Sequence, residues 1–429
     1  MSKHIPVSRN SLPGADDITR KVLGNGIVVL ARANFNSPSV VLNGYLPAGG
    51  LFDPDEKLGL ADFTSAALMR GTQARDFQQI YDALESVGAS FGYSSGAHNA
   101  GFNARSLVED LPLLLDIMAD TLLQPAFPAE QVEKLRAQLL TGLAIRAQDT
   151  SEMASLKFDE ILFEGHPYSR ADEGWPETIQ AITRDDLADF HRRYYGPKGM
   201  VIAIVGAVEP GKAVSEVERV LGGWQNPVQP DALKVPEASP LAGIVRRHHA
   251  IPGKSQSDIV MGTNGPKRRD AEYMAASLGN NILGQFGLMG RIGDVVREQS
   301  GLAYYAYSSL SAGIGPGAWY VSAGVNPSNV DKAVDLITSE LKRFVDEGVT
   351  ADELADSQAN FVGRLPLSLE SNAGVAGALL NIERYDLGLD YYRQYPDLVQ
   401  AVTLEEVREA ARKFIDPARL AIATAGPAD

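Results

Sequence analysis

The sequence predicts an α+β fold that is made twice, as two homologous domains in which a sheet is covered by helices. Three observations predict it. The 429 residues are too many for one ordinary hydrophobic core, so at least two domains are expected. Segments of one half of the sequence resemble segments of the other half in the same order. Within each half, strand-like and helix-like segments alternate.

An internal repeat with a spacing of about 220 residues is the strongest of these observations. Its longest match aligns "ITRDDLADFHRRYYGPKGMVIAIVG" at 182–206 with "VTLEEVREAARKFIDPARLAIATAG" at 402–426, without gaps. Two shorter pairs agree at nearly the same spacing: "FPAEQVEKLRAQLLTGL" from Phe127 with "VTADELADSQANFVGRL" from Val349, and "PSVVLNG" from Pro38 with "SDIVMGT" from Ser257. The order predicts an N-terminal repeat over 15–225, a Pro-rich linker over 226–240 and a C-terminal repeat over 241–429.

The N-terminal repeat is expected to begin with strands. "GIVVLARA" at 26–33 and "SVVLNGYL" at 39–46 are rich in β-branched residues, which is typical of strands. "GASFGYSSGAHNAGFNARS" at 88–106 is rich in Gly and Ser with some alternation, and indicates one or two strands with a turn. "PKGMVIAIVG" at 197–206 indicates a buried strand that follows a helix.

Helices are expected between these strands. "DFQQIYDALESVG" at 76–88 places apolar residues on one helical stripe and ends at Gly88. "SLVEDLPLLLDIMADTLL" at 106–123 indicates a second helix, in which Pro112 is tolerated only near the first turn. Strand pairs that alternate with helix pairs predict an antiparallel or mixed sheet under helices.

Charge and composition exclude several classes of function. The formal charge of −15 at pH 7 provides no basic face for phosphate groups, so nucleic acid and anionic membranes are not expected partners. The absence of cysteine excludes disulfides, thiolate metal ligands and a thiol nucleophile. No segment has the apolar length of a signal peptide or a membrane span. We expect a cytoplasmic protein, or a periplasmic one if a native signal peptide was removed.

Three kinds of motif imitate catalytic or ligand sites. "GYSSG" at 92–96 matches the nucleophile elbow of serine hydrolases, but no helix pattern follows it. "GAVEPGKA" at 206–213 resembles a phosphate-binding loop, although Ala213 stands where a hydroxyl belongs, and a strand-to-helix turn explains it without a nucleotide. The six histidines have no spacing typical of a metal site, so surface or packing roles are expected.

"GLADFTSAALMRGT" at 59–72 carries a family resemblance, together with a match from "LGNGIVVLARA" through both repeats to "LAIATAG". The chain resembles the pitrilysin and insulinase family of inverzincin peptidases, in the two-repeat type that includes the mitochondrial processing peptidase subunits. Zinc subunits of that family have G-L-A-H-x-x-E-H-x-x-x-x-G-T in this segment, with two histidine ligands and a glutamate that activates water. Here Asp62, Ser65 and Ala66 stand at those positions, and Thr141 or Gly142 stands where the family has a further glutamate ligand. The resemblance therefore implies no metal in this chain.

"GNNILGQFGLMGRIGDVVREQSGLAYYAYSS" at 279–309 resembles the family's segment that contains R-x-x-x-G-x-A-Y, here Arg297 to Tyr304. The resemblance implies that Arg297 and Tyr304 are catalytic, because in the family these two side chains hold the substrate backbone and the tyrosine hydroxyl lies close to the carbonyl that becomes an oxyanion. It also implies a substrate-binding role for Gly284, Phe286 and Gly287, although a tight turn before a helix explains the glycines equally well.

These observations support the hypothesis that the chain is the zinc-free subunit of a heteromeric zinc metalloendopeptidase, forming half of a clamshell. A homologous partner subunit with H-x-x-E-H would supply zinc, and peptides would be the substrates. No peptidase activity is expected from this chain alone. The alternative is a non-enzymatic peptide-binding or scaffold protein of the same fold, and a third hypothesis is nucleotide binding at 206–213.

Overall fold

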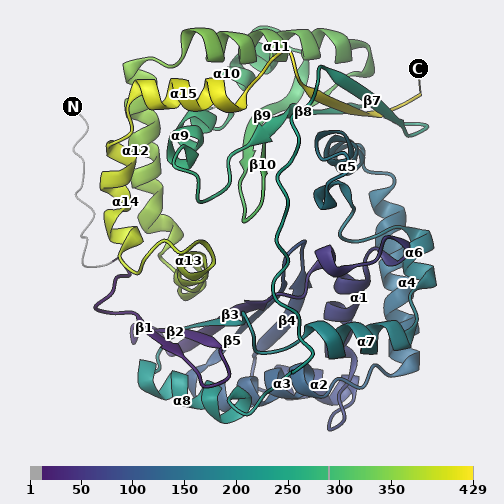
Figure 1. The fold of residues 1–429 in the computed structure, drawn as a ribbon, viewed down its shortest axis with the longest axis vertical. Helices are drawn as coiled ribbons and strands as arrows, with labels where there is room; N and C mark the ends of the chain where they lie inside the picture. Colours follow the sequence, from purple (N-terminus) through teal and green to yellow (C-terminus); the bar gives the residue numbers. More distant parts are fainter. Residues whose placement is uncertain (1–11, 288–289, 429) are drawn as a thin grey trace. The chain divides into compact units, whose positions relative to one another are not determined.

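The computed structural model describes residues 12–287 and 290–428, which form two compact units, each built on one mixed sheet (Figure 1). Unit 1 holds the described residues up to Leu143 together with Ala171–Leu233 and Leu365–Gln394. Unit 2 holds Ala144–Arg170, Lys234–Arg364 and the described residues from Tyr395 onward. The predicted fold class, an α+β fold with two sheets, is confirmed.

The sheet of unit 1 has six strands in the order β1-β2-β6-β3-β5-β4. The strands are β1 (Thr19–Val22), β2 (Val28–Ala33), β3 (Ser39–Leu46), β4 (Ser90–Ser95), β5 (Ala100–Leu107) and β6 (Val201–Gly206). β2 and β6 are parallel, and the other neighbours are antiparallel. Every residue of β6 is buried, which explains its continuous apolar sequence.

The sheet of unit 2 repeats this topology with five strands in the order β7-β11-β8-β10-β9. The strands are β7 (Val245–Ala250), β8 (Ser257–Gly265), β9 (Ala303–Ser311), β10 (Gly317–Val325) and β11 (Ala421–Gly426). The one parallel pair, β7 with β11, corresponds to β2 with β6. The aligned sequence segments thus form equivalent strands, β6 with β11 and β3 with β8, so the chain contains two like domains.

The two repeats also share a helix cap at aligned positions. Thr183 begins one helix, where its side chain accepts a hydrogen bond from the Asp186 amide while the Asp186 carboxylate accepts from the Thr183 amide at 2.7 Å. Thr403 and Glu406 form the same capping box at the aligned positions, with a matching distance of 2.7 Å. Each box satisfies amide groups that a helix start leaves without partners, so it fixes where the helix begins.

Helices cover both sheets. In unit 1 these are α1 (Leu60–Ala67), α2 (Phe77–Glu85), α3 (Leu111–Leu123), α4 (Ala129–Arg146), α6 (Pro176–Ala181), α7 (Arg184–Tyr194), α8 (Pro210–Leu221) and α13 (Asn372–Tyr385). In unit 2 they are α5 (Thr150–Leu162), α9 (Tyr273–Gly284), α10 (Gly290–Gly293), α11 (Val330–Glu347), α12 (Ala351–Ser368), α14 (Tyr391–Gln400) and α15 (Leu404–Phe414). Three of these, α4, α12 and α14, cross a unit boundary and are grouped here with the unit that holds most of their residues.

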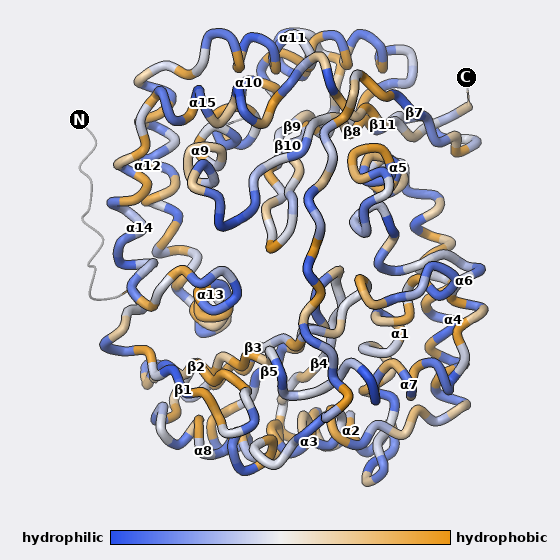
Figure 2. The backbone as a smooth tube through the Cα atoms, viewed as in Figure 1, coloured by the Kyte–Doolittle hydropathy of each residue, from blue (hydrophilic) through white to orange (hydrophobic). Residues whose placement is uncertain are grey.

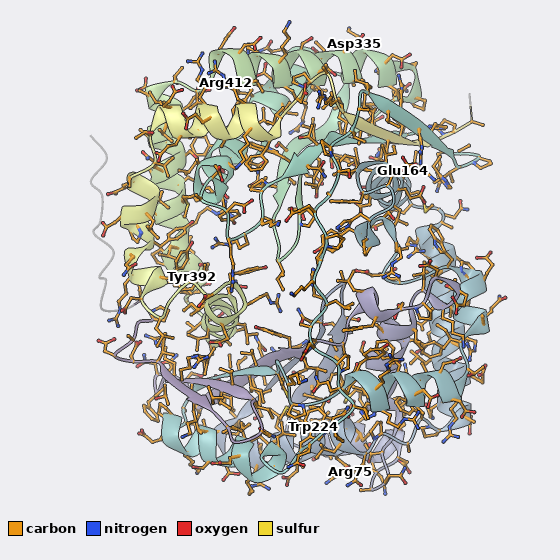
Figure 3. All side chains as sticks on the ribbon, viewed as in Figure 1. Arg75, Glu164, Trp224, Asp335, Tyr392 and Arg412 are labelled. Atoms are coloured by element: carbon orange, nitrogen blue, oxygen red, sulfur yellow. The ribbon has the colours of Figure 1, made fainter. Side chains whose placement is uncertain are left out.

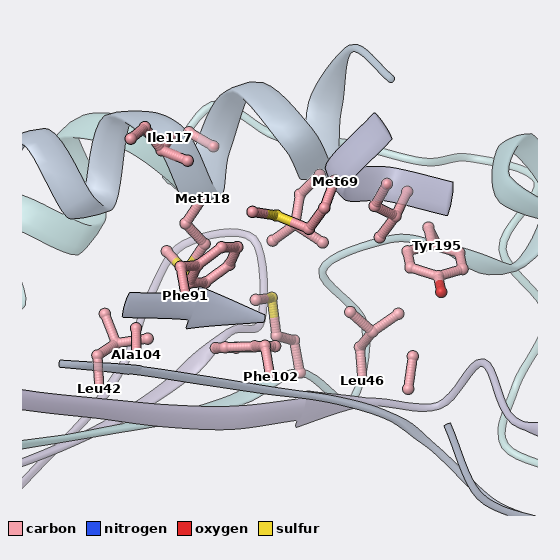
Figure 4. Close-up of a cluster of buried hydrophobic side chains, with 14 of the residues drawn as sticks. Leu42, Leu46, Met69, Phe91, Phe102, Ala104, Ile117, Met118 and Tyr195 are labelled. Carbon is pink, nitrogen blue, oxygen red and sulfur yellow. The ribbon is translucent and has the colours of Figure 1, made fainter. Parts of the chain in front are cut away.

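Amphipathic helices close the cores. In unit 1, Phe91 of β4, Phe102 of β5 and Met118 of α3 meet between the sheet and the helix (Figure 4). In unit 2, α11 and α15 alternate between polar and apolar residues along their length (Figure 2). Asp335 of α11 and Arg412 of α15 are exposed and point away from the sheet (Figure 3). Burial of the apolar stripes therefore holds these helices in place.

Each unit takes one helix from the opposite half of the sequence. α13 belongs to the C-terminal half of the sequence, but it packs on β6 and β3 of unit 1. Arg20 also anchors α13 through a bidentate ion pair, in which its Nε and Nη2 donate to the two Glu383 carboxylate oxygens at 2.8 and 2.7 Å. Conversely, α5 packs on β11, β8 and β7 of unit 2, where the Phe158 and Tyr320 rings lie 5.6 Å apart. The compact units therefore combine residues from both halves of the sequence. The ranges 15–225 and 241–429 describe the sequence repeat, and as domain boundaries they stay a prediction.

Most of the predicted elements occur where they were expected. The strand at 39–46 is β3, the helix at 76–88 is α2 with Asp76 as its cap, and 88–106 forms the β4–β5 hairpin. The helix expected at 106–123 begins only at Leu111, because Pro112 fits the first turn and Ser106 belongs to β5. No helix in the described residues is long and apolar enough to cross a membrane.

Candidate functional site

The helix α1 begins at a glycine that no other residue could replace easily. Gly59 has φ +91°, and a Cβ there would lie 2.6 Å from Ile179 Cδ1 and 2.7 Å from the Glu173 carbonyl oxygen. The buried Asp53 carboxylate caps the helix by accepting hydrogen bonds from the Gly59 and Ala61 amides, both at 2.9 Å. The "GLA" of the sequence thus serves to start this helix.

The positions that would hold zinc on α1 do not fit a zinc ion. The Ser65 hydroxyl is buried and donates to the Asp62 carbonyl oxygen at 3.0 Å, so it is used by the helix itself. Ala66 offers no ligand, and Asp62 alone cannot complete a tetrahedral shell. On α4, Thr141 and Gly142 are exposed, and the Thr141 hydroxyl donates to the Ala137 carbonyl oxygen. In the part of the chain that the structure describes, no group of three or more His or carboxylate residues could hold a metal ion.

Asp62 carries a pKa that is unusual for an aspartate. Burial, with the nearby carboxylates of Glu173 and Asp172, raises the pKa of Asp62 from 3.8 to about 6. Each of these causes disfavours the charged form. Position 62 thus holds a carboxyl group whose ionisation lowers the stability of the fold.

That cost leads to a prediction about pH. The folded state binds the Asp62 proton more tightly than the unfolded state, so Asp62 destabilises the fold increasingly as pH rises from about 4 through about 6. Asp62→Asn should therefore raise the free energy of unfolding by about 1–3 kcal/mol at about pH 8 and by little at about pH 4. Urea unfolding at both pH values measures this, with Asp55→Asn at an exposed site as the control. An equal effect of Asp62→Asn at both pH values would contradict the explanation.

Arg297 lies in a widened helical turn at the end of a helix. The helix α10 continues into a π-helical turn over Asp294–Gln299, and the chain leaves it at Gly301, whose φ is +61° and whose amide donates to the Arg297 carbonyl oxygen. The expected position of Arg297 near the helix end is confirmed, but the π-helical geometry was not predicted. The Arg297 side chain is 37% exposed, and its Nε lies 3.6 Å from the Glu298 carboxylate, which is a loose ion pair. Much of its donor fork is therefore open to a ligand.

Tyr304 lies at a β-bulge near the start of β9. Along the β9–β10 pair, Tyr305 lies opposite Gly324 and Ala303 lies opposite Val325, so Tyr304 is the extra residue. A bulge leaves such a residue unpaired and re-aims its side chain. Tyr304 is accordingly 64% exposed, an unusual value for a strand aromatic.

The glycine-rich segment before Arg297 has two kinds of glycine. Gly284 ends α9 and touches β9: a Cβ there would lie 2.0 Å from the Ser308 amide nitrogen. Gly290 is equally crowded, with a Cβ position 2.6 Å from the Ile282 carbonyl oxygen, and it has φ +64°. Gly287 has φ +64° in open space, and the neighbouring Phe286 is 40% exposed. Packing therefore explains Gly284, whereas Phe286 and Gly287 lie at the surface.

The structure brings the predicted site residues of the C-terminal half to neighbouring elements. The segments that carry Gly284, Arg297 and Tyr304 are α9, the π-helical turn and β9, and each of the first two packs against β9. Arg291, at the start of α10, anchors this region with hydrogen bonds from Nε and Nη2 to Glu353 at 2.7 and 2.5 Å. A rigid support of this kind is what a group needs if it is to act on a substrate at a fixed place.

Histidines and the other imitating motifs have structural explanations. Ser94 of "GYSSG" lies within β4, not in a turn between a strand and a helix. His166 is buried and bonded to the Pro236 carbonyl oxygen at 3.0 Å. Burial lowers the pKa of His191 to about 4, and its Nε2 lies 2.9 Å from the Leu122 carbonyl oxygen. "GAVEPGKA" forms the turn from β6 into α8.

One feature near Tyr304 was missed by the sequence interpretation. A cavity of about 450 Å³ is lined by Asp258, Tyr305 and Tyr307 together with the start of α5. The alternating tyrosines of "AYYAYSS" could have indicated it, because Tyr305 and Tyr307 share one face of a strand.

Comparisons with known proteins cover most of the chain. A family model described as "Insulinase (Peptidase family M16)" matches residues 28–171, and one described as "Peptidase M16 inactive domain" matches residues 181–361. An uncharacterized zinc protease of Streptomyces coelicolor is 27% identical over 94% of this chain and 88% of its own length. The mitochondrial-processing peptidase subunit beta of Saccharomyces cerevisiae is 25% identical over 82% of this chain and 79% of its own length.

A solved structure is also similar. The crystal structure of a peptidase M16 inactive domain from Pseudomonas fluorescens superimposes with a TM-score of 0.89 at 28% identity, over 96% of this chain and 98% of that one.

Proposed function

The chain belongs to the insulinase (M16) peptidase family, and from this premise we propose that it is the zinc-free subunit of a heteromeric zinc metalloendopeptidase. In this proposal a second, homologous chain carries H-x-x-E-H and the zinc. This chain closes the chamber and contributes Arg297 and Tyr304 to the hydrolysis of peptides.

One observation carries the proposal: the residue types expected for zinc are missing from α1, whereas those expected for substrate binding are present near β9. On α1, the positions of the ligands and the general base hold Asp62, Ser65 and Ala66, which cannot bind zinc. Near β9, the arginine and the tyrosine are both present on well-packed elements, with Arg297 half-buried and Tyr304 exposed. A protein that no longer bound peptides would not need these two accessible side chains, one on a β-bulge and one on a π-helical turn.

Arg297 and Tyr304 are suited to different tasks. The Arg297 guanidinium is a planar fork of donors that can hold peptide carbonyl groups of the substrate. The Tyr304 hydroxyl can donate a hydrogen bond to the oxygen that becomes negative when water attacks the scissile carbonyl. Zinc in the partner would supply the activated water, and this chain would supply the donors.

The edge of the unit 2 sheet offers a place for the substrate backbone. β9 is an edge strand, so one side of it has no neighbouring strand within the sheet. An extended peptide that pairs with this edge would gain main-chain hydrogen bonds of the kind that peptide-binding domains use. Tyr304, on the same strand, would then lie alongside the bound chain.

A mixing experiment tests the proposal. Hydrolysis of a quenched-fluorescent peptide library is measured for this chain, for a homologous H-x-x-E-H chain from the same genome and for their mixture, with and without a chelator. We expect hydrolysis by the mixture at least about tenfold above the sum of the separate chains, and loss of it on chelation. If this chain binds peptides tightly but no mixture gains activity, the proposal fails in favour of a non-enzymatic peptide-binding protein.

A further inference from the structure

The cavity beside β9 is built around a buried carboxylate. Asp258, at the start of β8, is only 1% exposed. It accepts hydrogen bonds from the hydroxyls of Tyr305 and Thr150 and from the Gln256 amide, whose nitrogen lies 3.1 Å from both carboxylate oxygens. All three donors are neutral, and among the described residues no lysine, arginine or histidine forms an ion pair with Asp258. The wall of the cavity therefore contains a carboxylate that is hydrogen-bonded only to neutral groups.

A glycine makes this arrangement possible. Asp258 and Tyr305 lie on either side of Gly324 in one row across β8, β10 and β9. A Cβ on Gly324 would lie 2.5 Å from the Tyr305 ring and 2.8 Å from the Gln256 amide nitrogen. Only without that side chain can the tyrosine cross the middle strand and reach the carboxylate, so the row is a specific construction.

The open side of the cavity is aromatic and acidic. The Tyr305 and Tyr307 rings are stacked with centroids 5.7 Å apart, and Tyr307 is 37% exposed. Asp149, the exposed N-cap of α5, lines the same cavity, and among the described residues that line it there is no lysine, arginine or histidine. Tyrosine faces and carboxylates together attract cations.

We propose that this cavity binds the side chain of an arginine or lysine from a bound peptide, with Tyr307 providing the aromatic face and Asp149 and Asp258 the opposite charge. A peptide is favoured as the source of the cation because the cavity lies on β9, the edge strand. Along an extended chain paired with that edge, alternate side chains point to the face of Tyr305 and Tyr307. The inference rests on the proposed function for the nature of the ligand, and it adds a preference for basic side chains next to Tyr304.

Equilibrium binding to this chain alone tests the inference. Fluorescence anisotropy is measured with a labelled, end-blocked octapeptide that contains one arginine and with the same peptide containing citrulline, which keeps the shape but has no charge. We expect the arginine peptide to bind about tenfold more tightly. In Asp149→Asn and in Asp258→Asn, the preference should fall below about threefold. Asparagine still caps a helix, so Asp149→Asn removes the charge and keeps the start of α5.

Asp76→Asn is the matched control, because Asp76 is also an exposed helix cap, on α2 in unit 1. It should keep the full preference for arginine. Equal binding of the arginine and citrulline peptides, or an unchanged preference in both cavity variants, would overturn the inference. So would binding of N-acetylarginine amide as tight as that of the peptide, since the ligand would then be a small cation. An arginine preference without hydrolysis in any mixture would leave the cavity assigned and reject only the peptidase proposal.

Discussion

Replacing Tyr304 by phenylalanine is expected to lower kcat of the reconstituted pair by about 10²–10³-fold. The change removes one hydroxyl, and with it a donor to the oxyanion that forms only during reaction. Because the carbonyl oxygen of the bound substrate carries much less charge, KM should change little. The side chain is 64% exposed, so the fold should not depend on its hydroxyl. Steady-state kinetics with one peptide of the library, at a saturating ratio of the two chains, measures the effect.

A second tyrosine provides the control for this variant. Tyr81 lies on α2 in unit 1, where the centroids of its ring and the Phe77 ring are 4.7 Å apart. Tyr81→Phe removes the same atom elsewhere and should leave kcat and KM unchanged. Unaltered turnover in Tyr304→Phe, with normal pairing of the chains, would remove Tyr304 from the catalytic role and leave it as an exposed residue of a bulge.

Gly284→Ala is expected to lower the free energy of unfolding by about 2–3 kcal/mol. Its new methyl group would lie 2.0 Å from the Ser308 amide nitrogen and 2.3 Å from the Ser308 Cβ. Both belong to a buried part of β9, so α9 and the strand would have to move apart. Urea unfolding followed by circular dichroism measures the loss.

Gly142→Ala is the matched control for the packing explanation. Gly142 lies within α4, is exposed, and has no atom within 4 Å of a Cβ added there. Alanine has the higher helix propensity, so this variant should gain about 0.5–1 kcal/mol. If Gly284→Ala unfolds like the wild type but no longer binds peptide, Gly284 acts on the substrate and the packing explanation is wrong.

Local sequence patterns predicted the strands and helices well because their causes are local. The eight residues of β3 coincide with "SVVLNGYL", and the Thr183 and Thr403 capping boxes begin two equivalent helices at aligned positions. The π-helical turn around Arg297 was not predicted, because it is the last turn before Gly301 and no helical residues follow it whose apolar pattern could show the extra residue. The bulge at Tyr304 was missed for a similar reason: it depends on the pairing with β10.

The sequence by itself determined that two like domains exist, that α1 lacks the residues to hold zinc, and that Arg297 and Tyr304 are present in the family's pattern. These are properties of residue identity and spacing. Only the tertiary structure decided that α5 packs on the sheet of unit 2 and α13 on that of unit 1, because an apolar stripe specifies burial but not the sheet that buries it. It also decided that Asp258, Gly324 and Tyr305 form one row, since such a row depends on the register of three strands that lie far apart in the sequence.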